Sequence, residues 1–133
     1  MKAGLKDFAA GYATEAQTAE NIHDVYKKTG YVMDTHTAVA AHVCQEYQEN
    51  SGDKTKCVVA STASPYKFAG SVMAAIDEKY ASVDEFDLLK ELSQVSNTEM
   101  PNAIKEILNA NILHTLECDV DKMEDTVKAI LEL

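Results

Sequence analysis

The chain lacks long apolar runs and paired cysteines, and each absence excludes a class of protein. No apolar stretch approaches the roughly 20 residues that cross a bilayer, and residues 1–11 lack the apolar core of a signal peptide. Cys44, Cys57 and Cys118 are odd in number and show no CxxC spacing. We therefore expect reduced thiols in a cytoplasmic protein that is neither membrane-spanning nor built on disulfides or zinc.

Basic residues are also few. The chain has 12 Lys and Arg residues against 22 Asp and Glu residues, which gives a net charge of −10. The basic residues are scattered, whereas nucleic-acid binding needs clusters of them, so nucleic acid and membrane surfaces are not expected partners. The five glycines are isolated from one another, so the chain has no glycine-rich loop of the kind that holds phosphate.

The four histidines do not have the spacing of a metal site. His36 and His42 are six residues apart, not the four that place two zinc ligands on one helix face. We expect His23 on the solvated side of a helix and His114 in a structural role within a strand. No metal ligand is predicted, and a metal-dependent hydrolase has little support.

With 133 residues, 46% hydrophobic and 26% charged, the chain suits one domain spanning residues 1–133. Thr14 and Gln17 predict a capping box for a helix that ends at Gly30, and Asp34 caps a second helix that ends at Ser51-Gly52. A further helix is predicted over residues 65–80, and another follows a capping box of Ser82 and Glu85. Two more are predicted to begin at Pro101 and at Asp119 or Asp121.

Two short apolar segments, residues 56–60 and 112–118, predict strands, and residues 93–100 predict a linker. The expected fold class is therefore α/β and helix-rich, with short central strands flanked by several helices. Residues 61–64, three of which carry hydroxyl groups, follow the first predicted strand, where α/β proteins place ligand contacts. The alternative is structural: Ser64 caps a helix that begins at Pro65, and Thr62 only solvates a turn.

Two motifs resemble the C-terminal part of threonine synthases. Residues 31–39 read YVMDTHTAV and match the family's Asp-Pro-His-Thr-Ala-Val run, except that Thr35 replaces proline. Residues 61–68 read STASPYKF and match its Thr-Ala-(His or Ser)-Pro-x-Lys-Phe run from Thr62 onward. The resemblance extends more weakly from about Phe8 to residues 112–115. It covers most of this chain but only about the last third of a full family member.

This resemblance implies the C-terminal portion of a pyridoxal-phosphate enzyme of fold type II, in the tryptophan-synthase-β-like group. Threonine synthase is a lyase of threonine biosynthesis that converts O-phospho-L-homoserine and water to L-threonine and phosphate. In this group a Ser or Thr hydroxyl faces the pyridine nitrogen of the cofactor, and the matched motif gives that role to Thr62. A neutral hydrogen-bond donor leaves the ring nitrogen largely unprotonated and the cofactor a weaker electron sink.

Other residues near the two motifs each have two alternative roles. The segment from Asp34 to Ala38 resembles the helix start that borders the cofactor, so its backbone N–H groups or His36 would line the pocket. Alternatively, His36 and Thr37 only cap and pack the helix. Lys67 either reaches a substrate phosphate or faces solvent.

The chain lacks the family's segment that carries the Schiff-base lysine, similar to His-Gly-Pro-Thr-x-Ala-Phe-Lys-Asp. Because catalysis in this group is covalent through that lysine, the chain alone is expected to be inactive, without catalytic residues or bound pyridoxal phosphate. We expect a C-terminal fragment of threonine synthase, whose exposed apolar face would favour self-association. The alternative is a stand-alone acidic interaction module without catalysis.

Overall fold

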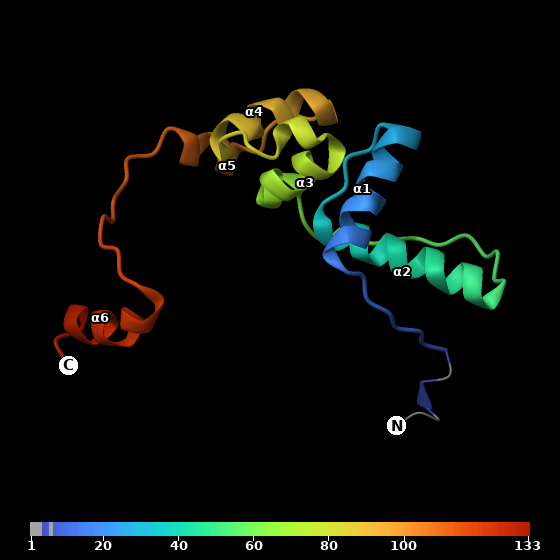
Figure 1. Ribbon diagram of the computed structural model, residues 1–133, viewed down its shortest axis with the longest axis horizontal. Helices are drawn as coiled ribbons and strands as arrows, with labels where there is room; N and C mark the ends of the chain where they lie inside the picture. The colour runs from blue at the N-terminus through green and yellow to red at the C-terminus, as the bar shows by residue number, and fades with distance from the viewer. Residues whose placement is uncertain (1–3, 6) are drawn as a thin grey trace.

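The computed structural model describes residues 4–5 and 7–133, and these residues form helices joined by turns and extended segments (Figure 1). None of the described residues forms a strand, so the predicted α/β fold with central strands is wrong. Within the described residues, no helix has the length and apolar character to cross a bilayer. The elements are α1 (Glu15–Thr29), α2 (Thr35–Ser51), η2 (Pro65–Phe68), α3 (Ala69–Ile76), η3 (Glu78–Tyr80), α4 (Glu85–Ser96), α5 (Asn102–Leu108), η4 (Val120–Lys122) and α6 (Met123–Ile130).

The first helix begins and ends where its sequence signals predict. The side chain of Thr14 accepts from the backbone N–H of Gln17 at 3.3 Å, and Gln17 Oε1 accepts from the Thr14 N–H at 2.8 Å. These two bonds form a capping box. At the other end Gly30 has a φ of 74° and donates to the Tyr26 carbonyl at 2.8 Å. Glycine suits this left-handed position because it has no Cβ.

The predicted helix over residues 65–80 is divided into η2, α3 and η3. The division follows two residues with non-helical backbone, Phe68 (φ −136°, ψ 49°) and Asp77 (φ −154°, ψ 125°). Asp77 then caps η3 by accepting from the Lys79 N–H at 3.1 Å. The local sequence did not show these breaks because both flanks carry helix-compatible residues.

The next helix starts at a different residue from the one predicted. Asp84, not Ser82, caps α4 by accepting from the Phe86 N–H at 2.9 Å. The helix continues through Ser96, so the predicted linker over residues 93–100 is wrong in its first half. The predictions of a helix after Pro101 and of a C-terminal helix are confirmed by α5 and α6.

The hydrophobic core lies among α1, α3 and α4, with contributions from the segment before α2. Val72, Met73 and Leu92 are fully buried in it. Helix α1 packs against both α2 and α3, and α3 packs against α4. The buried members of this core are Ile22, Val32, Met33, Ala38, Tyr66, Ala69, Val72, Met73, Ile76, Leu88, Leu89 and Leu92.

Neither predicted strand forms. Residues 56–60 are extended but exposed, and Val58 is 94% exposed. Residues 112–118 are likewise exposed and irregular, and with them His114. A strand is stable only when a neighbouring strand satisfies its backbone N–H and C=O groups. The two apolar segments do not pair with each other or with other described residues, so their composition alone does not produce a sheet.

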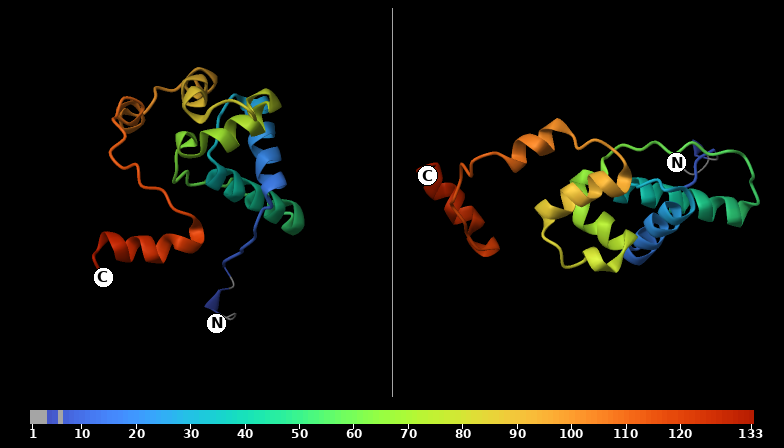
Figure 2. Two further views of the ribbon diagram at one scale, coloured as in Figure 1. Left: turned by 60° about the vertical axis from the view of Figure 1, so that its left-hand side comes forward. Right: turned by 90° about the horizontal axis from the view of Figure 1, so that it is seen from above.

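The C-terminal helix lies apart from the helical cluster. Residues 109–119 run as an extended segment between α5 and α6, and both figures show α6 at the far end of this segment (Figures 1 and 2). The apolar side chains of α6 are exposed, including Val127 and Ile130 at 52% and 62%. Helix α6 therefore presents an apolar face that no other described element covers.

Candidate functional site

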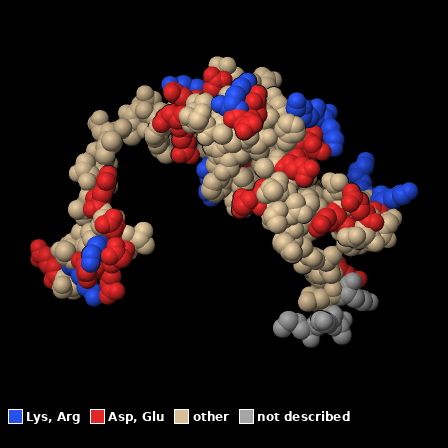
Figure 3. Space-filling model, in the orientation of Figure 1, with Lys and Arg blue, Asp and Glu red and all other residues tan. Residues whose placement is uncertain are grey.

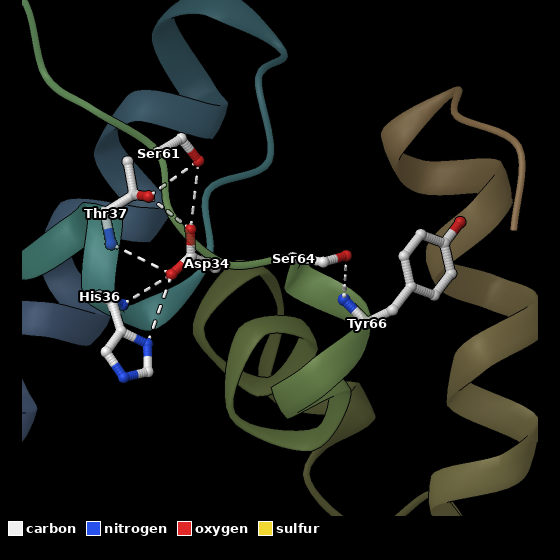
Figure 4. Close-up of polar contacts among 6 residues, drawn as sticks. All are labelled: Asp34, His36, Thr37, Ser61, Ser64 and Tyr66. Carbon is white, nitrogen blue, oxygen red and sulfur yellow. Dashed lines mark hydrogen bonds and ion pairs between the residues drawn. The ribbon is translucent and has the colours of Figure 1, made fainter. Parts of the chain in front are cut away.

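The start of α2 is organised around the carboxylate of Asp34, which is 1% exposed (Figure 4). Its Oδ1 accepts from the backbone N–H groups of His36 at 2.9 Å and Thr37 at 3.1 Å. These are two of the N–H groups that a helix start leaves without intrahelical partners. The predicted cap at Asp34 is therefore confirmed, and it places the threonine-synthase-like motif on the first turn of α2.

Two hydroxyl groups complete the surroundings of this carboxylate. The Thr37 hydroxyl donates to Asp34 Oδ2, and Thr37 Oγ1 lies 3.0 Å from Ser61 Oγ. The Ser61 hydroxyl oxygen lies 3.4 Å from the same Asp34 Oδ2. The network therefore joins the first motif to the residue that precedes Thr62 in the second.

The hydrogen bonds decide the charge state of Asp34. Burial acts to raise its pKa, but the Thr37 hydroxyl, the N–H groups of Thr37 and His36, and the Ser61 hydroxyl together lower the pKa below its ordinary value. Asp34 is thus an ionised acceptor at neutral pH. Its chemistry in this arrangement is to hold the helix start and Ser61, not to exchange protons.

His36 lies beside this carboxylate but faces outward. Its Nδ1 lies 3.5 Å from Asp34 Oδ1, and its ring packs against Phe68 with the centroids 5.4 Å apart. His36 and Phe68 line an open pocket of about 310 Å³. The pocket is also lined by Ala13, Glu15, Thr18, Thr35, Val39 and Ser71. Thr37, in contrast, is buried in the cap network, which is the structural role considered for it.

The second motif has a structural part and an exposed part. Ser64 accepts from the Tyr66 N–H at 3.3 Å, with Pro65 at the first position of η2, so the predicted Ser64 cap is confirmed (Figure 4). Tyr66 is buried and its hydroxyl donates to the Thr98 carbonyl at 3.3 Å. These contacts fix the start of η2 against the segment after α4.

Thr62, the predicted cofactor contact, lies between Ser61 and Ser64 and is exposed. Lys67 is exposed as well, and its ammonium group lies 5.6 Å from the Phe68 ring centroid. Neither residue lines the pocket beside His36. The structure thus brings Asp34, His36 and Phe68 together, and places Thr62 and Lys67 on the adjoining surface.

Sequence reasoning missed the role of Ser61 and misplaced His23. The sequence shows Ser61 only as one hydroxyl among several, and no local signal links it to a carboxylate 27 positions earlier. His23 is half-buried rather than solvated, because its Nδ1 lies 3.2 Å from the Ala75 carbonyl oxygen between α1 and α3. In the part of the chain that the structure describes, no three His, Cys, Asp or Glu residues are grouped to hold a metal ion.

Together these features define a helical domain with an acid-capped helix start tied to a hydroxyl-rich connection. The family model described as "Threonine synthase, C-terminal" matches residues 37–127. That match covers more than half of the chain and includes the second motif. The chain belongs to the threonine synthase family, to which it corresponds in the C-terminal region, and this confirms the resemblance found in the motifs.

Individual relatives agree with this assignment. The chain is 29% identical over 111 residues to a threonine synthase of Corynebacterium glutamicum, which covers 81% of this chain and 22% of that protein. It is 32% identical over 95 residues to the mouse protein threonine synthase-like 1, and 31% identical over 96 residues to the human one. Both matches cover 71% of this chain and 11% of the relative. The chain thus spans about a fifth or less of the length of these relatives.

Proposed function

We propose that this chain forms the C-terminal part of a threonine synthase and contributes Thr62 to its pyridoxal-phosphate site. The observation that carries the proposal is the family match over residues 37–127, which includes both Ser61 and Thr62. The small share of each relative's length that the chain covers supports the first half of the proposal, that the chain is only a part of the enzyme. On this view the cofactor-bearing lysine and the phosphate-binding loop lie on polypeptide other than these 133 residues.

The surroundings of Thr62 fit a single contact to the cofactor. Thr62 is exposed, so its hydroxyl is accessible to a partner outside the described chain. Its neighbour Ser61 is held by Asp34 and Thr37, which limits the positions that the Thr62 backbone adopts. The pyridine nitrogen of the cofactor is an acceptor, and a threonine hydroxyl is a neutral donor of suitable size.

The distribution of charged side chains agrees with a site in which the rest of the enzyme binds the phosphate groups. Several Lys residues pair with nearby carboxylates, as Lys28 does with Asp24 at 3.1 Å and Lys128 with Glu124 at 2.6 Å. On the face shown in Figure 3, basic side chains lie among acidic ones and form no single large basic patch. The phosphate groups of cofactor and substrate would therefore take most of their charge partners from the rest of the enzyme.

When bound, pyridoxal phosphate supplies the electron sink for a reaction that removes phosphate from O-phospho-L-homoserine and adds water to give L-threonine. The residues of this chain would act by binding the cofactor ring and by holding the surrounding backbone in place. Thr62 donates a hydrogen bond to the ring nitrogen and keeps it largely unprotonated. Ionised Asp34 holds Ser61 and the start of α2, and His36 with Phe68 forms the adjoining wall.

A chimaeric enzyme tests this proposal. The C-terminal segment of the Corynebacterium glutamicum threonine synthase that aligns with this chain is replaced by the chain itself, and phosphate release from O-phospho-L-homoserine is measured. We expect turnover by the chimaera and none by the purified 133-residue chain. Turnover by the isolated chain would contradict the division of roles. A chimaera that folds and binds cofactor yet releases no phosphate would contradict the assignment of this chain to the enzyme.

A further inference from the structure

One face of α2 is covered by the extended segment that follows it. Gln48 Nε2 donates to the Thr55 carbonyl at 2.7 Å near the end of α2. Near its start, Thr37 Oγ1 lies 3.0 Å from Ser61 Oγ. The helix and the segment therefore run antiparallel between these two contacts, as Figures 1 and 2 also show for the stretch after α2.

Two cysteines lie at the same level between these contacts. Cys44 is four residues before Gln48, which corresponds to about 6 Å along a helix. Cys57 is two residues after Thr55, which corresponds to about 7 Å along an extended chain. Thr37, Cys44 and Gln48 also share one helix face, because they are separated by seven and four residues. The register of the two contacts thus sets Cys44 opposite Cys57.

The properties of the two thiols agree with this placement. Both cysteines are free in the structure; Cys44 is half-buried and Cys57 is exposed. The neighbouring Cys57 side chain, together with burial, raises the pKa of the Cys44 thiol. One thiol is therefore open to solution reagents, and its neighbour is half-buried.

We propose that Cys44 and Cys57 form a reversible redox pair that closes a disulfide in the presence of a low-molecular-weight disulfide such as oxidised glutathione. The exposed Cys57 thiolate attacks one glutathione sulfur, forms a mixed disulfide and releases one glutathione thiolate. Cys44 then loses its proton to solvent and attacks the Cys57 sulfur, which releases the second glutathione thiolate. The two cysteine sulfurs are oxidised and the glutathione disulfide is reduced to two thiols.

The cross-link would fasten the middle of residues 55–61 to α2. That segment leads directly to Ser61 and Thr62, so the disulfide would restrict the backbone on which Thr62 lies. The proposal does not rest on a cofactor role for Thr62, because the contacts that align the two cysteines join residues of this chain and do not involve Thr62.

Peptide mapping of the 133-residue chain tests the pair. The chain is equilibrated with oxidised and reduced glutathione, quenched with acid, alkylated and digested with trypsin without reduction. Residues 29–54 carry Cys44, residues 57–67 carry Cys57, and residues 106–122 carry Cys118, so each cysteine is on a separate peptide. We expect the first two peptides to be joined by a disulfide. Before digestion, the monomeric chain should be two hydrogens lighter, and its free thiols should fall from three to one.

Two variants and one competing pairing make the test decisive. Cys118→Ser should leave the link unchanged, because Cys118 lies in the exposed segment before η4. Cys57→Ser should abolish it. Links to Cys118 as frequent as the Cys44–Cys57 link would overturn the proposal, as would a glutathione mixed disulfide on Cys57 that persists without transfer to Cys44.

Discussion

The Ser61 hydroxyl oxygen lies 3.4 Å from a carboxylate oxygen of Asp34, although 27 residues separate the two positions. Thr37 bridges them, since its hydroxyl donates to Asp34 and lies 3.0 Å from Ser61. The same carboxylate caps α2. One buried acid therefore sets both the start of a helix and the position of the connection that carries Thr62.

Removal of this carboxylate should destabilise the chain. Asp34→Ala is expected to lower the free energy of unfolding by about 1–2 kcal/mol, because the helix cap and the bonds to both hydroxyls are lost together. The matched control is Asp24→Ala, which removes an exposed partner of Lys28 and should change stability by less than about 0.5 kcal/mol. Urea denaturation measures both, and equal effects would show that the Asp34 network adds nothing beyond a surface ion pair.

The same residue should make stability depend on acidic pH. Since the folded-state pKa of Asp34 is lowered from the ordinary value of 3.8, its contribution is complete at higher pH. The contribution is lost as the pH falls through the lowered value. Between about pH 5 and pH 2 the urea midpoint of the unaltered chain should therefore fall further than that of Asp34→Asn. Parallel curves for the two proteins would assign the acid sensitivity to other carboxylates.

Two glycines should respond in opposite directions to alanine. Gly30 ends α1 with a φ of 74°, where a Cβ is strained, so Gly30→Ala should cost about 1 kcal/mol. Gly70 lies in α3, and an added Cβ there meets nothing within 4 Å. Gly70→Ala should stabilise the chain by about 0.5–1 kcal/mol. Thermal unfolding followed by circular dichroism distinguishes the two, and a loss of stability in both variants would contradict the structure around Gly70.

The apolar face of α6 should promote self-association, as expected for an apolar surface that no other described element covers. Val127 and Ile130 are exposed there, three residues apart on one side of the helix. Sedimentation measures the apparent mass at increasing protein concentration. This mass should rise less for the double variant Val127→Gln with Ile130→Gln than for the unaltered chain. Val120→Gln, a change at an exposed apolar residue before α6, is the control. A chain that stays monomeric at high concentration before any substitution would refute this prediction.

Local signals in the sequence predicted the ends of the first two helices correctly. The bonds of Thr14 with Gln17, and of Asp34 with the N–H groups that follow it, span three residues or fewer. Such interactions depend little on the rest of the fold. The family could also be identified from the sequence, because the residues of two short motifs can be matched without knowledge of the surrounding structure.

The predicted strands failed because a strand depends on a distant neighbour. The apolar residues 56–60 suggested a buried strand, yet they lie exposed along α2. The same dependence on distant contacts hid the link of Ser61 to Asp34 and the half-buried position of His23 against Ala75. No periodicity or spacing within either segment specifies these partners.

The most direct test of the account is a pair of substitutions at Thr62 in the chimaeric enzyme. Thr62→Val removes the hydroxyl with little change of shape, and Thr62→Ser keeps it. We expect the valine variant to bind cofactor with its visible absorbance band but to have a kcat at least about tenfold lower, equivalent to about 1.4 kcal/mol of transition-state stabilisation. The serine variant should keep most of the activity. Unchanged phosphate release by the valine variant would contradict the proposed contact between Thr62 and the cofactor ring.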